Sequence, residues 1–578
     1  METSLEPARA NAQVKDAASG DVERAVALAA DRAEEFARLA PQKKADLLER
    51  ITHGLAAFAG EMVALGCEAK GISRGSPAEA EEWFAGPSVA VGLARHHAMT
   101  MRDIAAKGRP RKPGKIERTK DGRVITHLAP MASGGRLVET GNVFRVLHTE
   151  GTTREQVTQG QAEMARFDGA PGVTAVLGAG NVASIPVADV LHTLFIENRT
   201  AVLKMNPVNA YLRAPFDKAF APLIEAGYLQ IVDGGAAVGA ALVEDKRVTH
   251  VHLTGSADTH DRIVWGPPGP EQIARKKEGR PALQKIVTSE LGNVSPILVV
   301  PYLYSTREIT AIAEMLATQI TNNASFNCNA GKMLVLPKGF PQRRLLIDTL
   351  ERVLGKVPVR KAYYPGAQER HRMLTAGREV VNVGAAKAED GTLPWSLVVD
   401  LDAGNGADPL FSTEPFCSIL SIVEVGSLDP IEFLEHAVTF CNEQLWGTLA
   451  ASLFVPPLFH DDGVVEHAVE KAIRRLEYGA VGVNVWPALV YATPRAPWGG
   501  HPKGTPEDVQ SGIGFVHNPL YLPRIEKTIV EGPLVPVPRP PFVVGAKHAI
   551  AAAKQLTEYA ANPGVGAAFN VVRATLLG

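Results

Sequence analysis

The sequence predicts an α/β protein with two Rossmann-like, doubly wound lobes. Two blocks of alternating strand and helix patterns, beginning near Val173 and near Lys285, indicate two parallel sheets that are covered by helices. With 46% hydrophobic and 21% charged residues, the chain has the composition of a globular protein with a sizeable core. Its 578 residues correspond to two or three large domains.

The region before the first block is predicted to be helical. A loose polar leader over residues 1–20 precedes helical patterns over residues 21–65 and 83–106. Pro41 is expected in the first turn of a helix, where its missing N–H costs little. The basic residues 108–122 indicate a solvated connector. Gly71-Ile72-Ser73-Arg74-Gly75 matches a serine nucleophile elbow only formally, because a helical pattern and not a strand precedes it.

The first block places polar residues and glycines where strands end. Predicted strands cover residues 173–178, 200–204, 229–232 and 248–253, and predicted helices cover residues 185–196, 215–226 and 236–243. Ligands of parallel sheets bind beyond the carboxyl ends of the strands, where Asn181, Lys204 and Gly255 fall. The Gly178-Ala179-Gly180 loop only half matches a dinucleotide-binding fingerprint.

The second block contains one exceptional loop, residues 321–331. Predicted strands cover residues 295–300, 333–336, 418–425 and 482–485, and predicted helices cover residues 308–320, 343–354 and 431–442. Cys328 lies in the loop between a helix and a strand, where a rigid scaffold can present a nucleophile. A lone cysteine is more often a small buried packing residue, which is our interpretation of Cys417 and Cys441.

Bulk properties exclude several classes of protein. A net charge of −2 gives no indication of a nucleic-acid partner. The four cysteines form no C-x-x-C pair, so neither a disulfide framework nor a metal site is expected. No secretory signal pattern or run of 18 apolar residues is present, which favours a cytoplasmic protein without a membrane partner.

Several short stretches, taken in order, resemble the NAD(P)-dependent aldehyde dehydrogenase superfamily. Gly180-Asn181 is followed by Lys204 after 23 residues, and Gly239 precedes Thr254-Gly255-Ser256. Glu290-Leu291-Gly292-Asn293 stands 38 residues before Cys328. Glu414-Pro415-Phe416, Asn484 and Pro497-Trp498-Gly499-Gly500 complete the resemblance, which covers roughly residues 21–518.

The resemblance implies a catalytic set and a cofactor set. Cys328 is the expected nucleophile, Glu290 the general base, and the Asn181 amide a donor to the oxyanion, roles that suit these residue types. The cofactor is expected to be NAD or NADP. The residues implied to bind it are Lys204, Gly239, Thr254, Gly255, Ser256, Leu291, Glu414 and Phe416.

Three departures from the family pattern leave the cofactor and the acyl acceptor open. Pro207 stands where NAD-preferring members often carry a glutamate for the ribose, so NADP is also considered. Val182 and Ala183 replace an aromatic and a proline, and Asn293 replaces a glycine. The leading hypothesis is oxidation of a small-molecule aldehyde to an acid. Alternatives are a CoA-acylating oxidoreductase and a non-catalytic binding protein on the same fold.

The resemblance also implies a division of the chain and an oligomer. A cofactor-binding domain is expected over residues 1–134 and 169–290, and a catalytic domain over residues 291–500. A bridging arm over residues 135–168 and 501–530 would join a homodimer or homotetramer, with a hairpin turning at Gly141-Asn142 and a second strand over residues 513–521. Residues 531–578 are predicted to be a proline-rich tether and one helix over residues 546–560.

Overall fold

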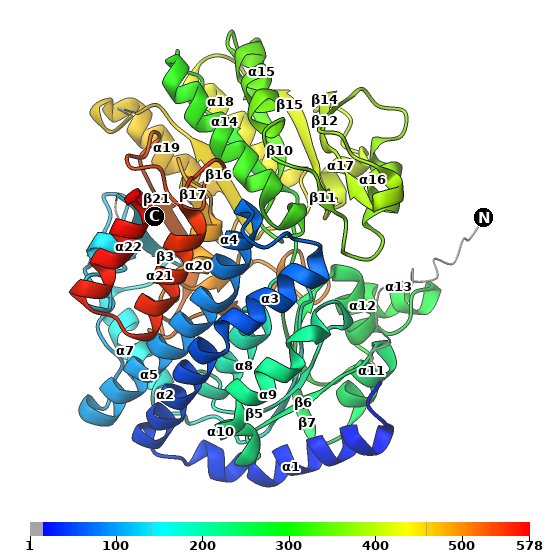
Figure 1. The fold of residues 1–578 in the computed structure, drawn as a ribbon, viewed down its shortest axis with the longest axis vertical. Helices are drawn as coiled ribbons and strands as arrows, with labels where there is room; N and C mark the ends of the chain where they lie inside the picture. Colours follow the sequence, from blue (N-terminus) through cyan, green and yellow to red (C-terminus); the bar gives the residue numbers. More distant parts are fainter. Residues whose placement is uncertain (1–15, 140, 458, 578) are drawn as a thin grey trace.

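The computed structural model describes residues 16–139, 141–457 and 459–577 and contains two lobes, each built around one large sheet (Figure 1). The predicted α/β class with two doubly wound lobes is confirmed. The largest apolar core cluster contains buried residues from both lobes, such as Leu203 and Leu334. The two lobes therefore share a packed core instead of being joined by a linker alone.

The first lobe contains a six-stranded sheet in the order β19-β8-β7-β4-β5-β6. Five strands are parallel, and the short β19 pairs antiparallel with β8. The strands are β4 (Val173–Leu177), β5 (Thr200–Lys204), β6 (Leu229–Val232), β7 (Val248–Gly255), β8 (Ile286–Leu291) and β19 (Gly512–Ile513). The four strands predicted in this block are confirmed, and their carboxyl ends meet at one edge of the sheet.

Helices cover both faces of this sheet, and the amino-terminal helices α2 to α5 pack beside it (Figure 1). Pro41 begins α2, as predicted. The helices of this lobe are α1 (Ser19–Ala37), α2 (Pro41–Ala57), α3 (Ala59–Lys70), α4 (Pro77–Trp83), α5 (Val89–Lys107), α7 (Arg154–Met164), α8 (Ile185–Phe195), α9 (Arg213–Ala219), α10 (Ala221–Glu225), α11 (Ala236–Glu244), α12 (Ala257–Trp265) and α13 (Pro270–Lys277). Ser73 follows α3 in a turn, so the predicted absence of a strand before it is confirmed.

The second lobe contains an eleven-stranded sheet in the order β1-β2-β3-β21-β17-β16-β9-β10-β15-β14-β12. Its centre, from β21 to β14, is parallel, and its two ends are antiparallel. The strands are β1 (Ile116–Arg118), β2 (Val124–His127), β3 (Val143–His148), β9 (Ser295–Val299), β10 (Gly331–Pro337), β12 (Val380–Val383), β14 (Trp395–Leu401), β15 (Ile419–Val425), β16 (Ala450–Phe454), β17 (Ala480–Val483) and β21 (Ile525–Glu531).

The helices of the second lobe begin at clear sequence signals. Ser305 and Glu308 form a reciprocal capping box at the start of α14 (Thr306–Thr321). Asp429 caps α18 (Pro430–Glu443), where proline is the first helical residue. The remaining helices of this lobe include α15 (Arg343–Leu354), α16 (Ala367–Thr375), α17 (Pro409–Ser412), α19 (Gly463–Arg475) and α20 (Ala488–Ala492).

The predicted exposed hairpin around Gly141-Asn142 is wrong. Residues before the turn form the short helix α6 (Gly135–Val138), and only β3 follows it. β3 is paired on both edges within this chain, to β2 and to β21, because its alternating apolar residues face the core of the second lobe. The predicted connector at residues 108–122 likewise contains β1, and the predicted second strand lies later in the chain, at β21.

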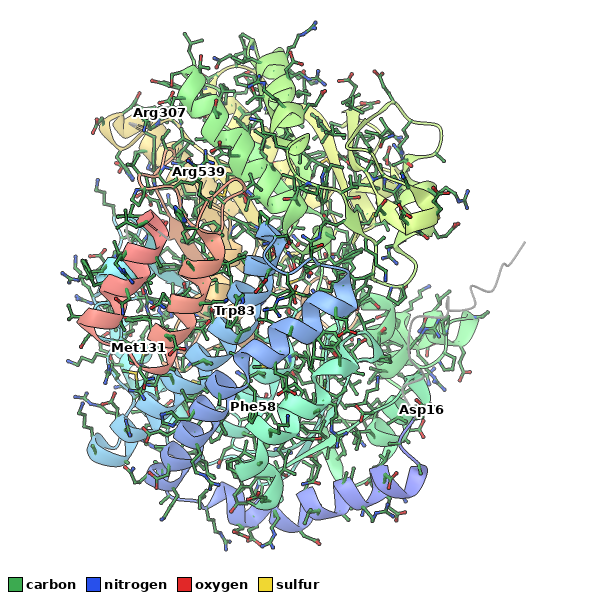
Figure 2. All side chains as sticks on the ribbon, viewed as in Figure 1. Asp16, Phe58, Trp83, Met131, Arg307 and Arg539 are labelled. Atoms are coloured by element: carbon green, nitrogen blue, oxygen red, sulfur yellow. The ribbon has the colours of Figure 1, made fainter. Side chains whose placement is uncertain are left out.

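The carboxyl-terminal segment packs against the amino-terminal helices. It contains two helices instead of the one predicted, α21 (Ala549–Ala561) and α22 (Val565–Leu577), with Pro563 between them. The Ser88 hydroxyl bonds the Thr557 hydroxyl at 2.6 Å, and Lys554 lies over the Trp83 ring, beside α21 (Figure 2). Within the described ranges, no helix has the length and apolar character needed to cross a membrane.

Candidate active site

Cys328 lies at the junction of the two lobes, in the segment between α14 and β10. A 3₁₀ turn, Asn322–Ser325, precedes it. Asn323, Ala324 and Ser325 all have left-handed backbone conformations, with φ values of 51°, 53° and 69°. Consecutive non-glycine residues in this region are costly and persist only where surrounding contacts enforce them. The position of Cys328 is therefore set by the contacts of this turn.

Asn323 makes most of those contacts. Its side-chain amide donates to the carbonyl oxygens of Asn181 and Phe326, both at 3.0 Å. Its side-chain oxygen accepts from Lys70 Nζ at 3.1 Å and from the Tyr363 hydroxyl at 2.9 Å. A buried and fully bonded amide fixes the local backbone strongly. Asn323 thus ties the Cys328 turn to the loop that carries Asn181.

Lys332 stabilises the same turn from the strand that follows it. Its ammonium group is buried and donates to the Ser325 hydroxyl at 2.8 Å and to the carbonyl oxygens of Ser325 and Cys417, each at 3.1 Å. Burial lowers the pKa of Lys332 to about 8. On the other side of the thiol, the Trp486 indole donates to the carbonyl of Asn329 at 2.9 Å.

Asn181 follows β4 and points its side chain at the cysteine turn. The side chain is only 5% exposed, and its amide donates to the Phe326 carbonyl at 3.0 Å. A side-chain amide carries two N–H donors, so one bond leaves a second donor for another acceptor. Asn181 and Cys328 line the same cavity, which is the arrangement that an oxyanion donor requires.

Glu290 is the second-last residue of β8 and faces the Cys328 thiol. Burial raises the pKa of Glu290 to about 7, and the nearby Asp189 carboxylate adds to this rise. Burial also raises the pKa of Cys328, together with the negative charges of Glu290 and Glu414. The thiol is therefore protonated at rest, and the adjacent carboxylate has the proton affinity of a general base that works near neutral pH.

Glu414 approaches the glycine that follows this strand. A Cβ atom on Gly292 would lie 2.0 Å from Glu414 Oε2, so only glycine fits there. Burial raises the pKa of Glu414 to about 8. Glu414 Oε1 is buried and has no hydrogen-bond partner among the residues that the structure describes. An acceptor left in this state is suited to a ligand hydroxyl.

The other predicted cofactor residues lie along the carboxyl edge of the six-stranded sheet. Lys204 ends β5, Gly255 ends β7, and Leu291 ends β8 with its side chain buried. Ser256 caps α12 by accepting from the Thr259 N–H at 3.2 Å. Gly239 lies within α11, where an added Cβ would meet only Leu177, at 4.0 Å.

Thr254 and Phe416, two of the predicted cofactor residues, contact other side chains of the site. The Thr254 hydroxyl donates to Asp189 at 2.9 Å, and His252 Nε2 lies 3.2 Å from the same carboxylate. Although burial alone would lower the pKa of His252, Asp189 raises it above its ordinary value. Phe416 packs its ring 5.7 Å from that of Phe326, two residues before Cys328.

Sequence reasoning missed the residues that hold the site in place, namely Lys70, Asn323, Lys332 and Asp189. Lys70 is the clearest case, since its buried ammonium contacts Glu82 at 2.8 Å and the Asn181 carbonyl at 3.0 Å. Asn323 and Lys332 stand close to Cys328 in the chain, so their proximity was an available signal. Lys70 and Asp189 lie on helices far away in sequence, and only the fold brings them here.

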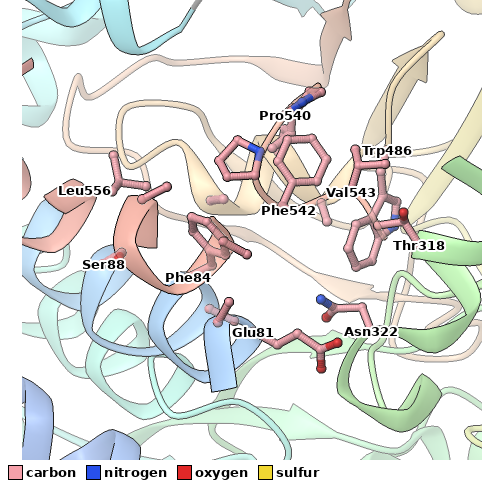
Figure 3. Close-up of a pocket in the computed structure, with 18 of the residues that line it drawn as sticks. Glu81, Phe84, Ser88, Thr318, Asn322, Trp486, Pro540, Phe542, Val543 and Leu556 are labelled. Atoms are coloured by element: carbon pink, nitrogen blue, oxygen red, sulfur yellow. The ribbon is translucent and has the colours of Figure 1, made fainter. Parts of the chain in front are cut away.

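A cavity of about 850 Å³ opens beside Cys328 and Asn181. Figure 3 shows that its walls come from distant segments of the chain, with Glu81 and Phe84 on one side, Thr318 and Asn322 on another, and Phe542 and Leu556 on a third. Pockets of 300–1,000 Å³ are typical of small-molecule sites.

The aldehyde dehydrogenase family profile matches residues 142–514, which include Asn181, Glu290 and Cys328. The chain belongs to the aldehyde dehydrogenase family. A curated relative, N-succinylglutamate 5-semialdehyde dehydrogenase from Burkholderia thailandensis, is 24% identical over 57% of this chain. The match covers 63% of that relative, less than two thirds of its length.

Solved structures of aldehyde dehydrogenases share the fold over most of their length. The aldehyde dehydrogenase KauB from Pseudomonas aeruginosa has a TM-score of 0.60 at 20% identity, with 90% of each chain covered. The NADP-dependent glyceraldehyde-3-phosphate dehydrogenase from Bacillus halodurans, solved with NADP, has a TM-score of 0.57 at 17% identity, covering 89% of this chain and 92% of that one. Among the described residues of this chain, Glu414 Oε1 has no hydrogen-bond partner, so its chemistry fits a hydroxyl donor such as those of a ribose.

Proposed function

We propose that this protein oxidises an aldehyde to a carboxylic acid, with NAD or NADP as the hydride acceptor. The observation that carries the proposal is the meeting of three groups at one site, namely the Cys328 thiol, the Glu290 carboxylate and the Asn181 amide. Family membership and a structural neighbour solved with NADP support it.

In the proposed mechanism, Glu290 accepts the thiol proton while Cys328 Sγ attacks the aldehyde carbon. The oxyanion of the resulting thiohemiacetal accepts from the Asn181 amide and the Cys328 backbone N–H. The bound cofactor supplies the site to which hydride leaves, and Cys328 is then held as a thioester. Glu290 first returns the thiol proton to solvent and then takes a proton from water, whose oxygen attacks the thioester. As the C–S bond breaks, the departing thiolate takes up this proton and the acid is released.

Cofactor binding is proposed to involve the edge of the six-stranded sheet. Lys204 would donate to the adenosine ribose, and the α12 amino terminus at Ser256 would face the pyrophosphate. Pro207 begins the turn after β5 and offers no side-chain acceptor for a 2′-hydroxyl. We therefore include NADP and not only NAD.

The test is oxidation of a panel of aldehydes, followed by the absorbance of NADH or NADPH. Cys328→Ala should abolish cofactor reduction, and Cys441→Ala, a buried cysteine on α18, serves as the matched control. Reduction at the wild-type rate in Cys328→Ala would remove this residue from the mechanism. Failure of every aldehyde with either cofactor would favour the non-catalytic alternative.

A CoA-dependent acylating reaction is the second candidate. Residues 180–186 suggest it, because the Gly-Asn-Val-x-Ser-Ile-Pro stretch resembles acyl-CoA-forming relatives. The buried Glu290 beside the thiol favours water as the acceptor. Analysis of the products with and without CoA separates the two reactions.

We also propose that the chain divides into a cofactor-binding domain (residues 1–134 and 169–290) and a catalytic domain (residues 291–500). The protein is further proposed to be cytoplasmic and to form a homodimer or homotetramer. Four free cysteines among the described residues suit a reducing compartment. The oligomer is the family's usual state, and light scattering at micromolar concentration measures it. A fully active monomer would contradict that assembly.

A further inference from the structure

The cavity beside Cys328 continues along one face of α5. Ser88, Val89, Gly92, Arg95, His96 and Met99 line it. These positions recur at helical spacing, so they form one stripe along the helix. At its near end, the Ala85 carbonyl accepts from the Ser184 hydroxyl, in the loop that follows Asn181. The stripe therefore begins next to the proposed oxyanion donor and leads away from it.

The carboxyl-terminal segment closes the opposite side of the cavity. Phe542, Val543, Leu556 and Tyr559 line it from this segment, and Figure 3 shows Phe542, Val543 and Leu556 facing Phe84. Apart from its few charged groups, the lining is mostly aliphatic and aromatic, which suits a hydrocarbon chain.

Arg95 is the exceptional residue of this lining. Of the four arginines around the cavity, Arg360 pairs with Glu81 at 3.1 Å, Arg495 with Glu139 at 2.5 Å, and Arg539 with Glu314 at 2.5 Å. Throughout residues 16–139, 141–457 and 459–577, no carboxylate pairs with Arg95. Its Nε is buried without a hydrogen-bond partner there.

An arginine in this state is prepared for an anionic ligand. Buried polar groups are nearly always bonded, so the unbonded Nε of Arg95, a residue that lines the cavity, calls for an explanation. The planar guanidinium matches a carboxylate with two parallel N–H donors. The nearby cations on Arg495 and Arg111 are each neutralised by a carboxylate of this chain, and Arg95 is not.

The distance from Ser88 to Arg95 along α5 indicates the length of hydrocarbon chain that fits between them. Arg95 stands seven residues after Ser88, which places it about 10 Å further along α5 at about 1.5 Å per residue. An extended hydrocarbon chain advances about 1.25 Å per carbon, given C–C bonds of about 1.5 Å. A chain of roughly eight carbons therefore spans this stretch of the cavity.

We propose that the substrate is a medium-chain aldehyde whose apolar chain ends in a carboxylate, and that Arg95 binds this carboxylate while Cys328 reacts with the aldehyde. The proposal rests on the oxidation proposed above for its chemistry. In that reaction the aldehyde carbon loses hydride to NAD(P)⁺ and gains the oxygen of water, so the product is a dicarboxylate. Arg95 takes no part in the bond changes.

Binding of the unreactive product class tests the site without catalysis. Calorimetry should show that nonanedioate binds wild-type protein roughly 10- to 100-fold more tightly than the neutral nonane-1,9-diol, the ratio expected for one charge-assisted pair. Arg95→Gln should remove this preference, and Arg95→Lys should restore part of it. Lys356→Gln removes an exposed cation from the rim of the same cavity and should retain the preference.

Equal binding of nonanedioate and nonane-1,9-diol by wild-type protein, or a preference that survives Arg95→Gln, would overturn the proposal. A kinetic experiment compares kcat/KM for 9-oxononanoate with kcat/KM for nonanal. The ratio of the first value to the second should fall about tenfold or more in Arg95→Gln, mainly because KM for 9-oxononanoate rises. If neither aldehyde is oxidised while the preference for nonanedioate persists, the proposed oxidation fails and the anion site stands.

Discussion

The pKa values of Cys328 and Glu290 are both raised by burial in the site. Burial and the neighbouring carboxylates keep the thiol protonated, while burial brings the pKa of Glu290 to about 7. A carboxyl with that pKa can accept a proton from the thiol and later from water. The pair therefore suits two proton transfers in one catalytic cycle.

Replacement of Glu290 by Gln should slow thioester hydrolysis more than hydride transfer. The amide cannot take a proton from water, but attack by Cys328 can still proceed at higher pH as thiolate forms. We expect a burst of NADH or NADPH followed by slow turnover, measured by stopped flow. Steady turnover equal to that of the wild type would exclude Glu290 as the base.

The pH dependence of hydrolysis should report the same carboxyl. Because the pKa of Glu290 is raised to about 7, the base is mostly protonated and inactive at pH 6 and mostly ionised at pH 8. The steady-state rate should rise through about pH 7 and then level off. Glu290→Gln should lose this inflection, and a profile flat from pH 6 to pH 8 in the wild type would contradict the assignment.

At this scale the sequence identified the reacting groups but not their supports. Cys328, Glu290 and Asn181 could be found because their order and spacing resemble a family pattern. The role of Lys70 could not be predicted, because a lysine at the end of a helix is usually exposed. Its burial becomes visible only when the fold places α3 beside the turn of Asn323. The predicted roles of the cofactor residues stay predictions.

Lys70 provides a test of how this turn is held. Its ammonium and the Glu82 carboxylate are 3% and 6% exposed, so removing the cation leaves a buried charge unpaired. Lys70→Met should lower the free energy of unfolding by about 3–5 kcal/mol, measured by urea denaturation. Arg24→Met, which breaks an exposed pair with Asp21, should change it little, and equal effects of the two would contradict this account.

At the scale of elements, local signals located most helices and the parallel strands. Ser305, Asp429 and Pro41 mark helix starts through capping and proline geometry, which short windows of sequence contain. The partner of a strand is not contained in such a window. β3 was therefore assigned to an exposed hairpin, although it pairs with β21, far away in the chain.

The capping box of α14 should matter for the stability of the helix and little for the site. Ser305→Ala removes the acceptor for the Glu308 N–H and should cost about 1 kcal/mol of stability. The loss occurs at the far end of α14 from Cys328, so kcat should be nearly unchanged while the melting temperature falls. An unchanged melting temperature would show that the box contributes nothing measurable.

At the scale of the whole molecule, the segment after β21 contacts both lobes and forms one wall of the cavity. Arg539 contacts Glu314 on α14, in the upper lobe of Figure 2, and α21 packs on α4 and α5. The proline-rich character of this segment could be predicted from the sequence, but the surface that it covers could not, because α4 and α5 lie far away in the chain.

Truncation after Gly532 should remove one wall of the cavity. No strand of the six-stranded sheet comes from this segment, so we expect cofactor binding to persist. Affinity for nonanedioate should fall, since the apolar wall that faces α5 is gone. Calorimetry with each ligand measures both effects, and unchanged affinity for nonanedioate would show that the segment does not contact the chain of the ligand.

The pairing of β3 with β21 has a consequence for synthesis on the ribosome. Arg145 on β3 and Glu531 on β21 form an ion pair across a separation of 386 residues. At about 5–20 residues per second, the emerging chain carries β3 for roughly 20–80 seconds before its partner is made. During that interval one edge of β3 offers unpaired N–H and C=O groups to other nascent chains. Expression at lower temperature, or with chaperones that shield strand edges, should therefore raise the yield of correctly folded protein.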